Sequence, residues 1–238
     1  MSIKVILFDL DGTLLPMDQS VFVKAYFGSL AKRLAPLGYE ADRLIEAIWS
    51  GTEAMVRNTG SKTNEEVFWD HFAKLFGEKA RADLPHFDAF YREEFDGVQK
   101  ACGYSPMAAE VIAEAKRLGL RVVLATNPIF PAIATEKRMV WAGLDKNDFE
   151  LYTTYENSRH CKPNPDYYRD ILGQLGVCAE ECLMVGNDVT EDMVAESLGM
   201  EVFLLTDCLI NKQGKDIAGY PSGGFPELLR FIQERILL

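Results

Sequence analysis

The chain has 238 residues, of which 48% are hydrophobic and 26% charged, and its formal net charge is −11. This composition supplies enough apolar side chains for a buried core and excludes a disordered chain. The acidic balance argues against nucleic-acid binding, which needs a basic surface, and no run of about eighteen apolar residues predicts a membrane span. We therefore expect a cytoplasmic globular protein with one large domain, or with a core and a smaller insert.

The five cysteines form no CxxC pair, so we expect neither a zinc site nor a disulfide framework. Cys178 and Cys182 are predicted to be buried free thiols. The apolar stretch 1–15 contains Asp9 and Asp11 and lacks a charged start and a cleavage site, so it does not read as a signal peptide. No obligate protein partner is evident.

The first predicted element is a strand at residues 3–8, which are nearly all apolar, as in a strand buried on both faces. The next segment, 17–100, is predicted to be entirely helical. Its apolar side chains recur at three- and four-residue spacing, beginning with Phe22 and Tyr26. Asp42 is a candidate cap of the second helix, and Thr63 with Glu66 predicts a capping box that opens the third.

Strands and helices alternate in the rest of the chain. Strands are expected at 122–125, around 151, at 183–185 and at 202–205; the helices between them are expected to end at the glycines near 119, 143, 176 and 199, and a last helix is expected at 226–236. Residues 222–224 read as an ordinary turn. This order predicts an α/β fold, with a Rossmann-like parallel sheet and helices on both of its faces. The predicted division is an α/β core of residues 1–16 and 101–238 and an inserted all-α cap of residues 17–100.

Polar residues follow the predicted strands. Asp9 and Asp11 end the first strand, and buried carboxylates are costly unless they are paired or bind a metal. Thr126 and Asn127 end the second, where a hydroxyl and nearby backbone N–H groups suit a phosphate oxygen. Each signal is weak alone, but the carboxyl ends of parallel strands meet at one edge of the sheet, where such folds bind ligands.

Two further motifs belong to this edge. Lys162-Pro163 is the third motif, although a single lysine is normally a surface residue and the signal is weak by itself. Asp188 and Asp192 follow the strand at 183–185 and share one face if a helix begins there; helix capping is the plain alternative. A cluster of Asp9, Asp11, Asp188 and Asp192 would repel itself unless a hard cation bound, and Mg²⁺ prefers such ligands.

In this order, DxDGT at 9–13, the strand-end Thr126, Lys162-Pro163 and GNDxxxD at 186–192 resemble the four motifs of the haloacid dehalogenase superfamily. The helical segment resembles the cap of that superfamily. The resemblance covers nearly the whole chain and implies a Mg²⁺-dependent phosphatase that acts on a small phosphorylated metabolite through an aspartyl-phosphate.

The resemblance also implies residue roles. Asp9 would be the nucleophile and Asp11 the general acid and base. Mg²⁺ would be held by Asp9, the backbone carbonyl of Asp11 and Asp188, with Asp192 supporting the metal shell. Three further residues would contact the phosphoryl group: Thr126, Asn127 and Lys162.

The same residues bear on other activities. Haloacid dehalogenases resemble the chain less well, because they lack the second aspartate at the position of Asp11. Phosphonate hydrolysis needs a cap lysine, and none is marked out among Lys24, Lys32, Lys62 and Lys74. A β-phosphoglucomutase-like phosphoryl transfer fits the same core residues and stays open. A receiver-like or phosphate-binding regulatory protein is the non-enzyme alternative. The polar loop 57–62 could face the substrate, or it could be a solvated turn.

Overall fold

The computed structural model describes residues 2–236. Its core is a six-stranded sheet in which every neighbouring pair is parallel, in the order β3-β2-β1-β4-β5-β6. The strands are β1 (Val5–Phe8), β2 (Arg121–Leu124), β3 (Leu151–Tyr152), β4 (Cys182–Gly186), β5 (Glu201–Leu205) and β6 (Ser222–Gly223). The predicted α/β fold is confirmed, and β1 lies in the middle of the sheet between β2 and β4.

Two apolar cores cover the two faces of the sheet. Ile6 and Phe8 of β1 belong to one core and Val5 and Leu7 to the other, because successive side chains of a strand point to opposite faces. The first core includes side chains of α6 (Pro106–Arg117), α7 (Ala132–Trp141) and α9 (Phe225–Ile236), and the second those of α8 (Pro165–Leu175) and the 3₁₀ helix η5 (Met193–Leu198). Both faces of the sheet are therefore buried, which accounts for its continuous apolar runs.

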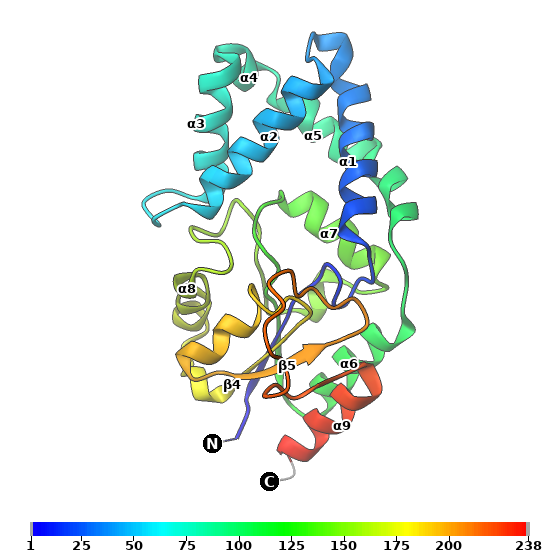
Figure 1. Cartoon of the computed structure of the whole chain (residues 1–238), viewed down its shortest axis with the longest axis vertical. Helices are drawn as coiled ribbons and strands as arrows, with labels where there is room; N and C mark the ends of the chain where they lie inside the picture. Colours follow the sequence, from blue (N-terminus) through cyan, green and yellow to red (C-terminus); the bar gives the residue numbers. More distant parts are fainter. Residues whose placement is uncertain (1, 237–238) are drawn as a thin grey trace.

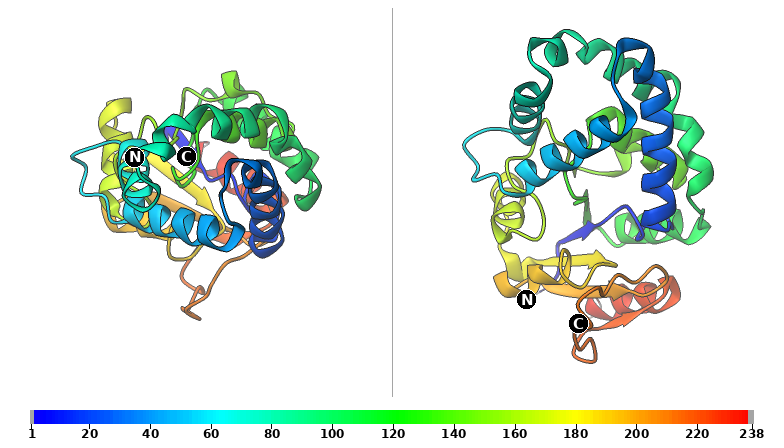
Figure 2. Two further views of the ribbon diagram at one scale, coloured as in Figure 1. Left: turned by 90° about the horizontal axis from the view of Figure 1, so that it is seen from above. Right: turned by 45° about the horizontal axis from the view of Figure 1, so that its top comes forward.

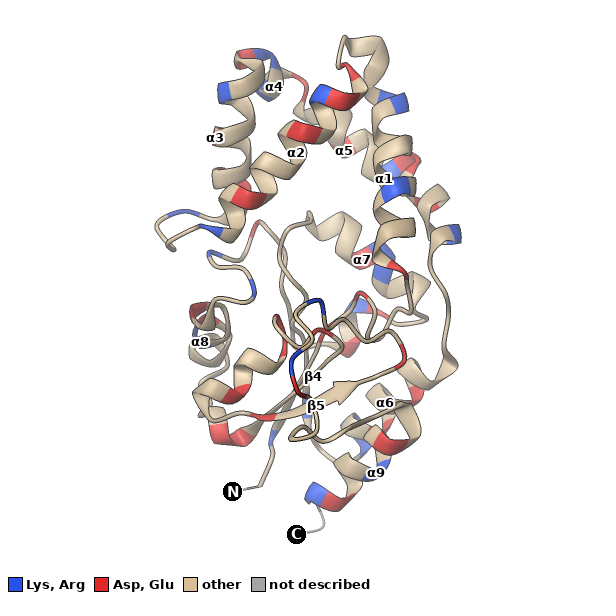
Figure 3. Ribbon diagram, viewed as in Figure 1, with Lys and Arg blue, Asp and Glu red and all other residues tan. Residues whose placement is uncertain are grey.

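The helices between β1 and α6 form a cap on one side of this core, as Figures 1 and 2 show. They are α1 (Gln19–Leu34), α2 (Ala41–Val56), α3 (Asn64–Phe76), α4 (Glu78–Ala82) and α5 (Leu84–Glu93), with the 3₁₀ helices η1 (Ala35–Leu37) and η2 (Phe95–Ala101). Acidic and basic positions are interspersed along these helices (Figure 3). The inserted helical cap is thus confirmed; its boundaries at residues 17 and 100 stay a prediction.

Local signals explain where several helices begin. The Thr63–Glu66 capping box is present, and Asn164 caps α8 by accepting a hydrogen bond from the backbone N–H of Asp166 at 2.9 Å. Asp42 does not cap α2, which begins at Ala41 and has no side-chain cap. The side chain of Ser105 likewise makes no capping bond to α6.

Two further elements and one cysteine differ from the sequence-based expectation. Residues 222–223 form the edge strand β6 rather than an ordinary turn. Between β4 and β5 the chain makes a turn and the 3₁₀ helix η5 instead of a helix that begins near Asp188. Cys178 is exposed, although Cys182 is buried, and all five cysteines are free. No helix within residues 2–236 has the length and hydropathy to cross a bilayer.

Candidate active site

Asp9 sits at the carboxyl end of β1, between the ends of β2 and β4. Its backbone N–H donates to the carbonyl of Val185 at 2.9 Å, so the residue continues the sheet, and its side chain is 10% exposed. The hydroxyl of Thr13 donates to Asp9 Oδ2 at 3.1 Å and lies 3.0 Å from Asn187 Oδ1. The carboxylate of Asp9 is therefore held in one orientation at the edge of the sheet.

Lys162 supplies the cation of this cluster. It is 1% exposed, and its Nζ donates to Asp9 Oδ1 at 2.9 Å and to Asp192 Oδ1 at 2.6 Å. Burial acts to lower the pKa of Lys162, but the carboxylates of Asp192 and Asp9 outweigh it and hold the pKa well above its usual value. Lys162 is therefore a permanent positive charge where an anionic substrate would need one.

The turn after β4 fixes Asp188 against Asp192. The backbone N–H of Asp188 donates to Asp192 Oδ2 at 2.9 Å, and the backbone N–H groups of Thr190 and Glu191 donate to Asp188 Oδ1 at 2.7 and 3.0 Å. Gly186 makes room for this arrangement, because a Cβ atom there would overlap the carboxylate of Asp192. The two acids are thus brought together by a turn and not by a shared helix face.

Asp11 is held by an arginine that the sequence analysis missed. Arg138 of α7 is fully buried and forms an ion pair with Asp11 Oδ2. Burial raises the pKa of Asp11, and Arg138 opposes this increase. The charge of Asp9 also raises the pKa, and that of Lys162 also lowers it. The net result is a pKa above the usual value for an aspartate. A carboxyl group with a raised pKa suits proton donation near neutral pH.

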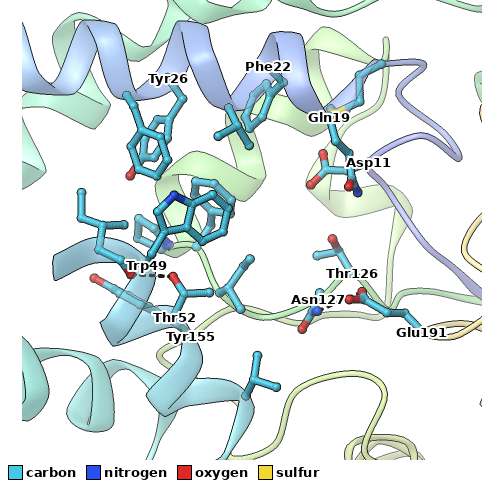
Figure 4. A pocket seen from close by; sticks show the side chains of 18 of the residues that line it. Asp11, Gln19, Phe22, Tyr26, Trp49, Thr52, Thr126, Asn127, Tyr155 and Glu191 are labelled. Carbon is cyan, nitrogen blue, oxygen red and sulfur yellow. Dashed lines mark hydrogen bonds between the residues drawn. The ribbon is translucent and has the colours of Figure 1, made fainter. Parts of the chain in front are cut away.

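Thr126 and Asn127 border the same cavity after β2 (Figure 4). The backbone of Thr126 is anchored because its carbonyl accepts hydrogen bonds from the hydroxyls of Thr153 at 2.7 Å and Tyr167 at 2.9 Å. Asn127 Nδ2 donates to Glu191 Oε2 at 3.0 Å. Burial raises the pKa of Glu191 to about 7, against the opposing charge of Lys162.

The donor atoms present fit a magnesium ion held by few side chains. Within residues 2–236, no three His, Cys, Asp or Glu side chains converge as a metal-binding group by themselves. The metal site implied by the resemblance needs only the carboxylates of Asp9 and Asp188 and the backbone carbonyl of Asp11. All three supply oxygen donors, which Mg²⁺ prefers. Both carboxylate oxygens of Asp192 are already engaged by Lys162 and Asp188, which suits a supporting role.

One cavity brings most of the candidate residues together. Its wall includes six of the seven: Asp9, Asp11, Thr126, Asn127, Asp188 and Asp192. Lys162 lies directly behind Asp9. The loop 57–62 contributes nothing to this wall; Arg57 pairs with Glu53, and Lys62 pairs with Asp70. The loop idea is therefore not supported by the structure.

The residues missed from the sequence share a reason. Arg138, Glu191 and Asn187 act through contacts with residues distant in the chain or through their position in an irregular turn. Arg138 lies within an amphipathic helix, where an arginine normally reads as a surface residue. Thr13 and Asn187 did carry a local signal, because they complete the DxDGT and GNDxxxD sequences.

Known proteins resemble the chain along most of its length. Residues 3–197 match the family model described as a haloacid dehalogenase-like hydrolase. The chain therefore belongs to the haloacid dehalogenase-like hydrolases, and it is an enzyme.

Individual relatives include phosphatases. A phosphoserine phosphatase of Thermus thermophilus is 31% identical over 217 residues, covering 80% of this chain and 83% of that protein. A phosphoglycolate phosphatase of Colwellia psychrerythraea is 25% identical over 208 residues, covering 85% and 84%. The crystal structure of a phosphatase of this family from Thermococcus onnurineus superposes with a TM-score of 0.61 at 22% identity, covering 97% of this chain and 98% of that one, which shows the shared fold.

Proposed function

We propose that this hydrolase is a Mg²⁺-dependent phosphatase that removes the phosphoryl group from a small phosphorylated molecule through an aspartyl-phosphate on Asp9. The observation that carries the proposal is the fixed Asp9 carboxylate, held by Lys162 and Thr13, with the proton-donating group of Asp11 two residues on. The phosphatases among its relatives support the same activity. A cytoplasmic location stays a prediction.

In the first step, a carboxylate oxygen of Asp9 attacks phosphorus and the bond from phosphorus to the ester oxygen breaks. The departing oxygen takes the proton of Asp11. Lys162 and the hydroxyl of Thr126 stabilise the negative charge of the phosphoryl group as it transfers. A Mg²⁺ ion held by Asp9, the carbonyl of Asp11 and Asp188 would supply further charge neutralisation.

In the second step, Asp11 accepts a proton from water, and the water oxygen attacks the phosphorus of the aspartyl-phosphate. The bond between phosphorus and the Asp9 oxygen breaks, which releases inorganic phosphate and restores the Asp9 carboxylate. Asp11 ends the cycle protonated, as it began. The cap forms part of the cavity wall, and we expect it to limit the access of bulk water during the first step.

The test is the release of inorganic phosphate from 4-nitrophenyl phosphate by the purified chain, with Mg²⁺ and with excess EDTA. We expect turnover only with Mg²⁺, and its loss in Asp9→Asn. Asp216→Asn, an exposed acid outside the cavity, is the matched control and should keep wild-type turnover. Sustained turnover by Asp9→Asn would overturn the nucleophile assignment.

A second readout follows the covalent intermediate itself. Asp11→Asn lacks the base for the second step, so with an ester that has a good leaving group it should accumulate protein heavier by one phosphoryl group after acid quenching. Peptide mapping should place that mass on Asp9. An isomerisation assay with glucose 1-phosphate, run beside it, tests the mutase alternative.

A further inference from the structure

The cavity above Asp9 has two chemically different ends, as Figure 4 shows. Asp11, Thr126, Asn127 and Glu191 lie at one end. Aromatic side chains of the cap, including Tyr26 and Trp49, lie toward the other. The volume is about 320 Å³, which is within the range of small-molecule sites. A substrate whose phosphoryl group reaches Asp9 would place its remaining atoms against the cap.

The cap end of the cavity is mainly apolar. Helices α1, α2, α3 and α5 all contribute aromatic rings to it: Phe22, Tyr26, Trp49, Trp69, Phe87 and Tyr91. The hydroxyls of Tyr26 and Tyr91 lie 2.7 Å apart and hydrogen-bond each other, and Thr52 donates to the carbonyl of Ile48 at 2.9 Å. These three hydroxyls are already paired and do not require a polar partner from the substrate, whereas the buried Nε1 of Trp69 has no hydrogen-bond partner among the described residues and leaves room for one acceptor atom.

Part of this apolar wall is uncovered. Trp49 is 51% exposed and Val56 is 38% exposed, and both line the cavity. The ring of Trp49 packs edge-on against Phe27 on one side, with centroids 5.5 Å apart. Covering such apolar surface with an apolar ligand group is favourable at roughly 25 cal/mol per Å².

The charges of the cavity wall disfavour a second anionic group of the substrate at the cap end. Among the described residues that line the cavity, Lys212 is the only lysine or arginine, against the acids Asp9, Asp11, Asp188, Glu191 and Asp192. No lysine or arginine of the cap lines the cavity, and two of them are paired elsewhere: Arg33 with Glu94 at 2.7 Å and Lys62 with Asp70 at 2.6 Å. A carboxylate bound at the cap end would therefore be desolvated without a partner, which is costly.

We propose that the substrate is a phosphate monoester of an uncharged, mainly apolar alcohol, whose apolar body packs against the aromatic cap wall. The inference rests on the proposed phosphatase activity and names its substrate class. It sets this chain apart from an enzyme for phosphorylated amino or hydroxy acids, because those substrates carry a carboxylate, and the residues that the cap contributes to the cavity wall include no lysine or arginine to bind it.

The test compares kcat/KM for three groups of esters: straight-chain alkyl phosphates from ethyl to hexyl, phenyl and 1-naphthyl phosphate, and the carboxylate-bearing phosphoserine and phosphoglycolate. Within the alkyl series, kcat/KM should rise about fourfold for each methylene that becomes buried. The carboxylate-bearing esters should be at least about 30-fold poorer than the best apolar ester.

A cap variant locates the effect. Trp49→Ala should lower the ratio of kcat/KM for 1-naphthyl phosphate to that for ethyl phosphate, because only the larger ester reaches the ring. Val140→Ala, at an exposed apolar side chain outside the cavity, is the control and should leave the ratio unchanged. Trp49→Lys should lower the same ratio and raise the relative rate with phosphoglycolate.

The outcomes separate the two proposals. Phosphoserine or phosphoglycolate as the best ester would overturn the substrate class and leave the phosphatase activity standing. An unchanged ratio in Trp49→Ala, or a flat alkyl series, would do the same. No Asp9-dependent hydrolysis of any ester would overturn the phosphatase proposal, and the substrate class with it.

Discussion

The guanidinium of Arg138 forms an ion pair with the carboxylate of Asp11, 127 positions earlier in the chain. The arginine is held on its other sides as well: Nε donates to the carbonyl of Ala134 at 3.2 Å, Nη2 donates to the hydroxyl of Thr135 at 3.3 Å, and the group lies 4.4 Å from the centre of the Phe130 ring. Asp11 Oδ1 is buried and has no hydrogen-bond partner among the described residues. Arg138 thus fixes one oxygen of Asp11 and leaves the other available for proton transfer.

The first prediction is that Arg138 positions Asp11 for catalysis. Arg138→Met keeps much of the side-chain volume and removes the ion pair. Because the phenolate of phenyl phosphate is a poor leaving group that needs a proton, kcat/KM for this ester should fall by about 10–100-fold. The loss should be much smaller for 2,4-dinitrophenyl phosphate, whose leaving oxygen needs no proton. Steady-state kinetics with both esters gives the comparison.

Arg138→Lys is the control, because it keeps the charge and should recover part of the rate with phenyl phosphate. A purely structural role predicts a different pattern, in which both esters lose rate equally. Equal losses would therefore contradict the positioning role, whatever the variant's stability.

The site residues at the strand ends could be predicted from the sequence. Asp9 could be placed because a buried apolar strand that ends in acids is unusual, and because parallel strands end at one edge. Thr126 and Lys162 gained meaning only from their order along the chain. The capping box at Thr63 was readable because its two residues are three apart and interact locally.

The other features of the site and the fold could not be predicted from the sequence, because they depend on tertiary contacts. Nothing near Arg138 in the sequence indicates its burial or its partner 127 positions away. The turn after β4 departs from a helix because the backbone N–H of Asp188 and the side chain of Lys162 both bind Asp192. Strand β6 is two residues long, too short for an alternating pattern to show.

The second prediction concerns Lys162. Lys162→Met should lower kcat by about 10²–10³-fold, because the transferring phosphoryl group loses a charged donor. It should also cost about 3–5 kcal/mol in the free energy of unfolding, since the carboxylates of Asp9 and Asp192 lose their cation. Urea denaturation measures the second effect. The control, Lys215→Met on an exposed loop, should change neither; wild-type stability in Lys162→Met would contradict the buried pairing.

The third prediction tests the space at Gly186. Gly186→Ala should displace the carboxylate of Asp192, disturb its bonds to Lys162 and Asp188, and lower both stability and kcat. Gly173→Ala is the matched control, because that position in α8 has open space around a Cβ atom. The control should be neutral or stabilising by up to about 1 kcal/mol, as expected for alanine in a helix. Similar unfolding curves for the two variants would show that Asp192 is not confined as described.

The fourth prediction is a pH dependence of thiol alkylation. Burial raises the pKa of Cys102 to about 11 and that of Cys182 to about 12. A raised pKa leaves less thiolate at a given pH, so at pH 8 a thiol with a pKa near 11 is only about 0.1% ionised, compared with roughly a quarter at the usual pKa of about 8.5. Iodoacetamide should therefore label the exposed Cys178 first, and labelling of Cys102 should rise about tenfold per pH unit between pH 8 and 10.

Peptide mass spectrometry under native conditions gives the labelling rate of each cysteine, with urea-unfolded protein as the control in which the differences vanish. Labelling of Cys102 at pH 8 as fast as that of Cys178 would contradict its partial burial.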